Sequence, residues 1–287
     1  MNSILKACLA TGALVAFGAP AMAALDSSDT GNGELILTLQ DAVAGRSLTY
    51  GLGINLNNVL PSVLQSQTGT VLSFNVTSQI SSLLASGATI ADLDYSIAAA
   101  DSLPSNVTAS ENRRGRQMVV TGALGGDAYE LLNNGLRTAT GNASSWTGVI
   151  NGATGSDKDG VVATSADAWY VEQGPWGLTV GNVFPNAAGS VGEALGFYYY
   201  ASSETYGPGE TVITYGTRNV ATRQAFQQST TNAYGEWLLS QQNGQYLLTY
   251  SYDAVTAPVP LPAAAWLLLS GLTGLGLIGR RRSAAAA

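Results

Sequence analysis

Carboxylates are the side chains of this sequence best suited to chemistry. The chain has 19 Asp and Glu residues and no histidine, and its single cysteine, Cys8, lies near the N-terminus. These counts exclude a Ser-His-Asp triad, a Cys/His zinc site and an intramolecular disulfide framework. A pair of carboxylates roughly 5–10 Å apart would suit glycoside hydrolysis, but the spacing selects no pair. We therefore expect no enzymatic activity, with a glycoside hydrolase or lyase as an alternative.

The second chemistry open to carboxylates is calcium binding. Asp157 and Asp159, followed by Gly160, have the alternation that begins an EF-hand loop. The next ligand position holds Val161 and the twelfth holds Ala168, neither of which supplies a side-chain oxygen. A solvated Asp-Gly turn is therefore the favoured interpretation.

A second acid-rich cluster is open to the same two interpretations. It consists of Asp26, Asp29, Asn32 and Glu34. We predict no cofactor, with one weak Ca²⁺ site as the alternative.

Aromatic side chains suggest a third possibility, which is contact with sugar rings. In a strand, Tyr198 and Tyr200 share one face, while Phe197 and Tyr199 share the other. One face would be core and the other exposed, and exposed rings can stack on carbohydrate. Three tryptophans could act in the same way: Trp169, Trp176 and Trp237. A carbohydrate-binding module is therefore an alternative function, although aromatic strand residues usually belong to a core.

The charge balance limits the classes of partner that this chain is expected to bind. Between residues 24 and 258 there are 19 acidic and eight basic residues, a net charge of about −11. Nucleic-acid binding depends on Lys and Arg that neutralise phosphates, so no nucleic acid is expected. Arg113, Arg114 and Arg116 form the main basic cluster of this region. They are either solvated or in contact with an acidic exopolysaccharide.

The segments that position these side chains have the pattern of many short strands separated by turns. Strand patterns cover residues 34–39, 70–76, 93–98, 117–121, 195–201 and 245–252. Helices are predicted at 78–85 and at 127–132, the second capped by residues 133–135, and a long flexible loop is predicted at 138–160. We predict a mainly β domain at residues 24–257, an antiparallel β-sandwich, with the 138–160 loop as the seam if there are two subdomains.

The N-terminus has the features of a secretory signal peptide. Lys6 precedes an uncharged run, and Ala21-Met22-Ala23 completes an Ala-x-Ala site. We predict a signal peptide at residues 1–23, with cleavage after Ala23 or Ala24. Lys6 lies only two residues before Cys8, which argues against a lipoprotein signal.

The C-terminus, residues 258–287, has three consecutive features. A rigid strip, Val259-Pro260-Leu261-Pro262-Ala263, is held extended by its prolines. Residues 263–279 follow without charge or proline, and as a helix they would be about 26 Å long, close to the apolar thickness of a bilayer. Arg280, Arg281 and Arg282 then fix the orientation, with the arginines inside the cell and the ectodomain outside. One C-terminal transmembrane helix at 263–279 is therefore predicted.

This order of features resembles the PEP-CTERM sorting signals, and the motif is similar to the VPLPA variant from Val259 to Leu272. The resemblance covers about a tenth of the chain and implies recognition by an exosortase, a membrane protease or transpeptidase of Gram-negative bacteria that make exopolysaccharide. It also implies processing near Pro260–Ala263.

The expectation from these features together is an exported cell-surface or extracellular matrix protein. The chain would cross the inner membrane, be anchored there transiently by its C-terminal helix, and then reach the cell surface or the medium. The main alternative is a periplasmic protein that stays anchored because its tail is never cut.

Overall fold

The computed structural model describes most of the region between Ala24 and Tyr252. The described residues are 24–26, 32–67, 69–102, 116–125, 130–152, 159–171, 187–202, 205–206, 213–214, 220–227 and 234–252. The chain divides into two compact units, residues 1–253 and 254–287, and every described residue belongs to the first.

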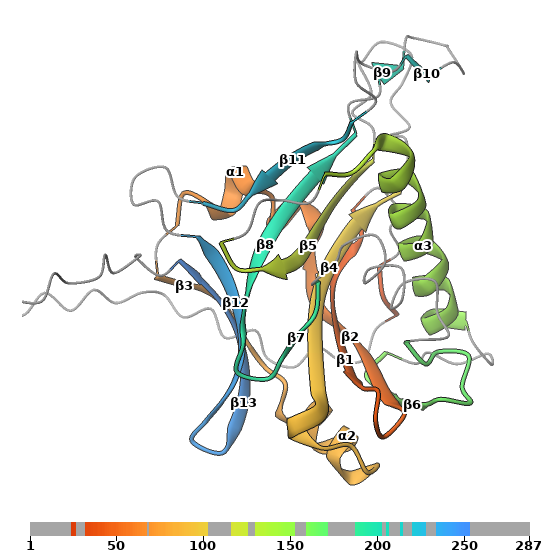
Figure 1. Ribbon diagram of the computed structural model, residues 1–287, viewed down its shortest axis with the longest axis vertical. Coiled ribbons are helices and arrows are strands. Elements are labelled where there is room, and N and C mark those ends of the chain that lie inside the picture. The colour runs from red at the N-terminus through yellow and green to blue at the C-terminus, as the bar shows by residue number, and fades with distance from the viewer. Residues whose placement is uncertain are drawn as a thin grey trace, which may run out of the picture. The chain divides into compact units, whose positions relative to one another are not determined.

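The first unit is mainly antiparallel β structure, as predicted (Figure 1). The principal strands are β1 (Glu34–Asp41), β2 (Arg46–Asn55), β3 (Gly69–Asn75), β4 (Leu93–Asp101), β5 (Gln117–Ala123), β8 (Ala194–Ala201), β12 (Gly235–Gln242) and β13 (Gln245–Tyr252). The shorter strands are β6 (Val162–Thr164), β7 (Gly189–Ser190), β9 (Thr205–Tyr206), β10 (Ile213–Thr214) and β11 (Thr222–Ala225). All six predicted strand segments coincide with strands of the structure.

The main sheet is one continuous curled sheet, where the sequence predicted a sandwich of two. Its strands follow the order β3-β13-β12-β8-β5-β4-β1-β2-β6. The strand β8 explains the curl: its first half pairs with β12 and its second half with β11, while β5 runs along its other side. The ribbon β12-β13-β3 therefore leaves the plane at β8 and folds over the inner face of β1 and β2. Local alternation of side chains does not specify such long-range pairing, which is why the sequence did not distinguish the two arrangements.

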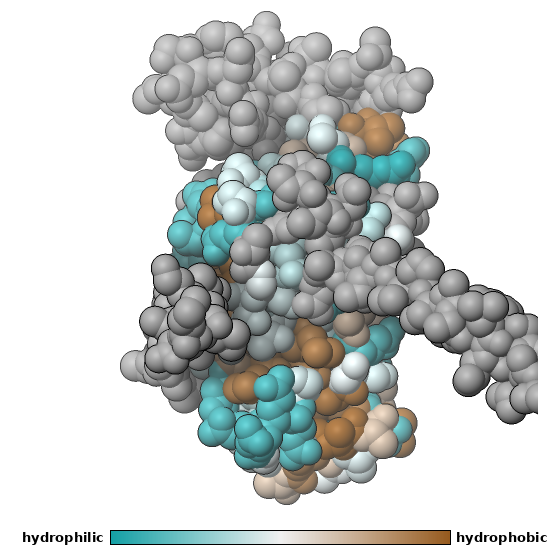
Figure 2. Space-filling model, turned by 90° about the vertical axis from the view of Figure 1, so that its left-hand side faces the viewer, coloured by the Kyte–Doolittle hydropathy of each residue, from teal (hydrophilic) through white to brown (hydrophobic). Residues whose placement is uncertain are grey.

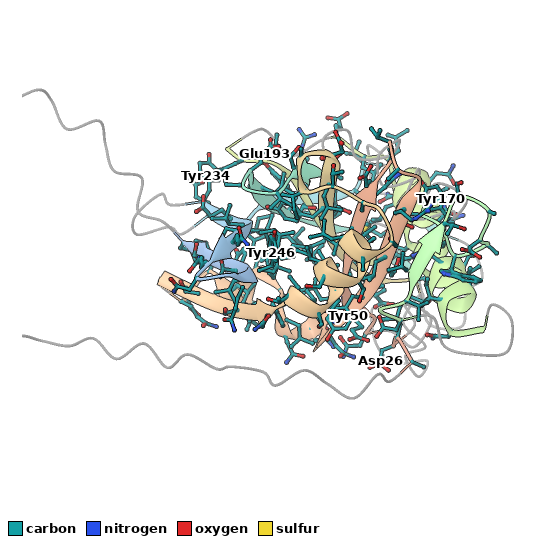
Figure 3. The ribbon with its side chains drawn as sticks, turned by 90° about the horizontal axis from the view of Figure 1, so that it is seen from below. Asp26, Tyr50, Tyr170, Glu193, Tyr234 and Tyr246 are labelled. Atoms are coloured by element: carbon teal, nitrogen blue, oxygen red, sulfur yellow. The ribbon has the colours of Figure 1, made fainter. Side chains whose placement is uncertain are left out.

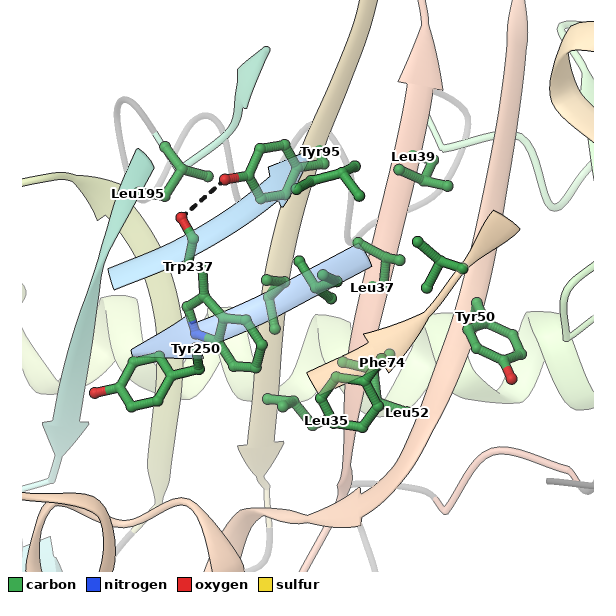
Figure 4. Packing of buried hydrophobic residues seen from close by; sticks show 14 of the residues in the cluster. Leu35, Leu37, Leu39, Tyr50, Leu52, Phe74, Tyr95, Leu195, Trp237 and Tyr250 are labelled. Carbon is green, nitrogen blue, oxygen red and sulfur yellow. Dashed lines mark hydrogen bonds between the residues drawn. The ribbon is translucent and has the colours of Figure 1, made fainter. Parts of the chain in front are cut away.

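The inner face of the curl holds the larger core. Leu35 and Leu37 of β1 belong to the same buried cluster as Trp237 and Tyr250 from the other end of the sheet (Figure 4). The rings of Trp237 and Tyr250 lie 5.1 Å apart. The Tyr95 hydroxyl lies 2.6 Å from the Glu193 carbonyl oxygen and 3.0 Å from that of Trp237, and so binds β4 to the strands opposite.

Two short helices and two single 3-10 turns border this inner core. They are α1 (Pro61–Leu64), α2 (Thr77–Ala85), η2 (Leu56–Asn58) and η3 (Ile90–Asp92). The helix α2 was predicted at 78–85, and it packs on β2 and β13 through Ile80 and Leu83.

The outer face is covered by a long helix that the sequence analysis missed. Helix α3 (Asn133–Gly152) packs on β4 and β5 and occupies much of the segment predicted as a loop at 138–160 (Figure 1). Its buried apolar residues recur with helical spacing: Leu136, Ala139, Ala143, Trp146 and Ile150. The predicted helix at 127–132 is wrong where it can be compared, because residues 130–132 are not helical and α3 begins at Asn133, the residue expected to cap a helix C-terminus.

Candidate functional site

The predicted sorting and processing residues lie outside the described residues. These are Ala23, Val259, Pro260, Leu261, Pro262, Ala263, Arg280, Arg281 and Arg282, together with the predicted membrane helix 263–279. Within the described part of the chain, no helix has the length and hydrophobicity needed to cross a membrane.

The structure brings Asp159 to the same strand as Asp26 and Glu34, two members of the N-terminal acidic cluster. They lie at the end of β2, beside the first described residues (Figure 3 labels Asp26 and Tyr50). Asp159 is 4% exposed, and its Oδ1 accepts the Gly51 N–H at 2.8 Å. The expectation of a solvated turn is therefore wrong for Asp159, while Asp157 and Lys158 lie outside the described residues.

The N-terminal acidic cluster converges on the same strand. Glu34 Oε1 accepts the Gly53 N–H at 2.6 Å, and Glu34 Oε2 accepts the Asp26 N–H at 3.2 Å. The Asn55 side-chain amide donates to Asp26 Oδ2 and to the Asn32 carbonyl oxygen, both at 2.9 Å. Asp29 lies outside the described residues. We call Asp26, Glu34 and Asp159 the carboxylate cap of β2.

Two glycines make this cap possible. A Cβ on Gly51 would lie 2.5 Å from Glu34 Oε1 and 2.7 Å from Leu25 Cδ2, so a side chain there would collide with both. Gly53 has a φ of +71°, in the left-handed region that favours glycine, close to the bulge between β1 and β2. Because residues 51 and 53 lack side chains, the carboxylates of Asp159 and Glu34 can reach the backbone N–H groups of this strand segment.

The cap has an electrostatic effect on its neighbour Tyr50. Burial, followed by the negative charges of Asp159 and Glu34, raises the pKa of the Tyr50 hydroxyl above its ordinary value. Among the described residues, no group of three or more Asp, Glu, Cys or His side chains is arranged to hold a metal ion. The cap accepts hydrogen bonds from backbone N–H groups and from the Asn55 amide, and so satisfies donors of β2.

A small cavity adjoins Glu34. It measures about 10 Å³ and lies between the sheet and α3, with Asp26, Glu34, Ile36, Ala143 and Thr147 in its lining. This volume accommodates about one water molecule. A sugar ring does not fit into this cavity.

The N-terminal segment is held by α3. Leu25 is 3% exposed, its N–H donates to Asn151 Oδ1 at 2.8 Å, and Asn151 Nδ2 donates to the Leu25 carbonyl oxygen at 2.8 Å. Sequence reasoning missed Asn151 because the residue lies in a segment predicted as a loop. A helical stripe of apolar residues ending at Ile150 was the available signal.

The predicted aromatic platform is not present among the described residues. The alternation on β8 is confirmed, with Tyr198 and Tyr200 in the outer core and Phe197 in the inner core. Tyr199 packs against the inner core, so neither face is an exposed aromatic surface. Trp237 is fully buried, Trp169 is half-buried, and Trp176 lies outside the described residues.

The basic cluster is represented in the structure by Arg116. Its Nε donates to the Ser102 carbonyl oxygen at 2.9 Å. Arg113 and Arg114 lie outside the described residues.

Comparisons of the chain with protein-family models, with curated proteins and with solved structures found no match.

Proposed function

We propose that this chain is an exported, exosortase-sorted surface or extracellular matrix protein whose β domain has a structural or binding role and no catalytic one. The observation that carries the proposal is the order of the C-terminal features: the Val259–Ala263 strip, an apolar segment at 263–279 and Arg280–Arg282. This order places an extended recognition motif just outside a membrane segment, with the arginines on the cytoplasmic side.

The start of the described domain supports the proposal. Leu25, two residues after the predicted cleavage site at Ala23, is already buried and bound by Asn151. A domain that begins at Ala24 therefore retains its first anchoring contact after residues 1–23 are removed.

The test is the intact mass of the protein in each cell fraction of its native host. We expect a chain that ends near Pro260–Ala263 at the outer surface or in the medium. A mass that still includes Arg280–Arg282, found in the inner membrane, would instead establish the permanently anchored alternative.

A double substitution tests the motif itself. Pro260→Ala with Pro262→Ala should leave full-length protein in the inner membrane, because the strip loses its enforced extended geometry. Pro258→Ala, one residue before the motif, is the matched control and should be processed normally. Normal processing of the double variant would rule out recognition through the two prolines.

A further inference from the structure

The strand β3 forms one end of the main sheet. Among the described strands it pairs only with β13. The Val76 N–H donates to the Tyr246 carbonyl oxygen at 2.9 Å, which fixes the alternation along the strand. The backbone groups of Phe74 therefore face β13, while those of Ser73 and Asn75 face away from it. Ser73 and Asn75 thus present N–H and C=O groups to a further strand.

The opposite end of the sheet is the three-residue strand β6, and the neighbouring strand β2 is covered along its outer edge. The strand β6 pairs with residues 46–48 of β2, and the Gly160 N–H donates to the Thr49 carbonyl oxygen at 2.7 Å. Farther along, the carboxylate cap binds the N–H groups of Gly51 and Gly53. In the described sheet four strands have a single neighbour: β3, β6, β7 and β11. The strand β3 is the longest of them, and it lacks the charge that Arg223 gives to β11.

The strands β3 and β13 carry no charged side chain. No charged residue occurs between Arg46 and Asp92 or between Glu236 and Asp253, so β3 and β13 are both uncharged. The whole chain has a net charge of −7, and two copies repel each other wherever acidic surfaces meet. Lys and Pro are two of the features that keep sheet edges from associating, and β3 has neither. Figure 2 shows this side of the molecule, where brown hydrophobic residues in the lower half lie among teal hydrophilic ones.

A bulge limits the usable length of the edge. The register of β3 with β13 shifts at Val71, because Leu72 pairs with Tyr250 whereas Thr70 pairs with Ser251. A bulge increases local twist and interrupts a ladder. The regular part, residues 72–75, we call the β3 edge.

We propose that the β3 edge is a self-association site, at which a second copy of this chain adds antiparallel through its own β3 edge. Such a contact is two-fold symmetric and uses the same surface of both copies. Because a two-fold contact occupies the same edge of both copies, it yields a dimer with one sheet continuous across both copies, and no fibre. This inference is independent of export and sorting.

Charged variants of Ser73 test the site. In the symmetric pairing, the two residue-73 side chains lie opposite or nearly opposite each other on the same face of the sheet. Ser73→Lys and Ser73→Glu should each weaken the dimer by about tenfold or more, because like charges then face each other. An equimolar mixture of the two variants should recover the dimer. Sedimentation of the full chain in a mild detergent measures all three samples.

The matched control is Ser251→Lys. Ser251 lies in β13, one strand in from the edge, and is half-exposed like Ser73. It adds the same charge away from the contact, so the dimer should persist. Equal dimerisation of wild type, Ser73→Lys and Ser251→Lys would overturn the proposal and assign association to another part of the chain. A wild-type chain that stays monomeric at every soluble concentration would overturn it as well.

A measurement on the unaltered chain guards against misfolded variants. Amide hydrogen exchange at Ser73 and Asn75 should slow as protein concentration rises, since their N–H groups become hydrogen-bonded in the dimer. Exchange that is fast at all concentrations would contradict the proposal. Slow exchange that does not depend on concentration would contradict it too, because it indicates that a segment of the same chain covers the edge.

Discussion

The side-chain amide of Asn151 forms a two-way clasp with the backbone of Leu25. It accepts from the Leu25 N–H and donates to the Leu25 carbonyl oxygen, each at 2.8 Å. The two residues are 126 positions apart, so the clasp ties the first described segment to the last turn of α3. The buried Leu25 side chain then fills the space that Gly51 leaves open.

Removing the clasp should release the N-terminal segment. Asn151→Ala leaves both Leu25 backbone groups without this partner, and we expect a loss of about 1–3 kcal/mol in the free energy of unfolding. Chemical denaturation measures this loss, and limited proteolysis should cut earlier near residues 24–26. The control is Asn142→Ala on the same helix, for which no side-chain hydrogen bond is described. This variant should be neutral or slightly stabilising because alanine favours helix. Equal stability of the two variants would show that the clasp is unimportant.

Two glycine-to-alanine substitutions compare a site where a side chain would collide with its neighbours with a site where it has room. Gly51→Ala places a methyl group against Glu34 Oε1 and Leu25 Cδ2, and should cost about 1–3 kcal/mol as overpacking. Gly141→Ala is the same change in α3, where a Cβ meets nothing within 4 Å. It should stabilise the protein by up to about 1 kcal/mol through helix propensity. Thermal unfolding of both variants would therefore show shifts of opposite sign. A neutral Gly51→Ala would mean that Glu34 moves aside at no cost.

The strands were predictable because their signal is local. In β13, Tyr246, Leu248, Tyr250 and Tyr252 alternate with half-exposed residues, as a strand with one buried face requires. The preceding turn is equally explicit, since Asn243 and Gly244 both have positive φ in a two-residue hairpin. Patterns of this kind give the class of the fold.

Helix α3 was missed because its local and tertiary signals disagree. The helix contains many residues of weak helix propensity, namely Ser, Thr and Asn together with Gly141, Gly148 and Gly152. Burial of Trp146, which is fully enclosed beneath the sheet's outer face, outweighs this weakness. The carboxylate cap was hidden for a related reason. Glu34 and Asp159 meet at β2 from distant parts of the chain, and no spacing rule joins them.

Acid should weaken the turn that Asp41 organises. Burial raises the pKa of this carboxyl, but hydrogen bonds from the N–H groups of Ala44, Thr89 and Val43 lower it by more, so the folded pKa lies below 3.8. A carboxyl with a lowered pKa stabilises the fold above its unfolded pKa. That stabilisation is lost as the pH falls below about 3.8 and through the folded value.

Asp41→Asn tests this assignment. The variant should be less stable at neutral pH, because a neutral amide is a weaker acceptor for the bonds that Ala44 and Thr89 donate at 2.8 Å. It should also lose less stability than wild type between pH 5 and pH 2. Urea unfolding midpoints across this range provide the measurement. Identical pH dependence in both proteins would assign acid sensitivity to other carboxylates.

Alkali should act on the aromatic core through Tyr252 and Tyr250. Burial raises the pKa of Tyr252 to about 12, and it also raises the pKa of Tyr250, whose ring lies 5.5 Å away. Since the folded pKa exceeds the unfolded value of 10.0, the stabilisation is complete below pH 10.0 and is lost as the pH rises through about 12. Phenolate absorbance followed together with circular dichroism should show these hydroxyls ionising only as the fold is lost. Tyr252→Phe removes one such group, so the free energy of unfolding should fall less steeply with pH above 10.0. Ionisation of all 13 tyrosines near their ordinary pKa with the fold intact would contradict the enclosed position of this pair.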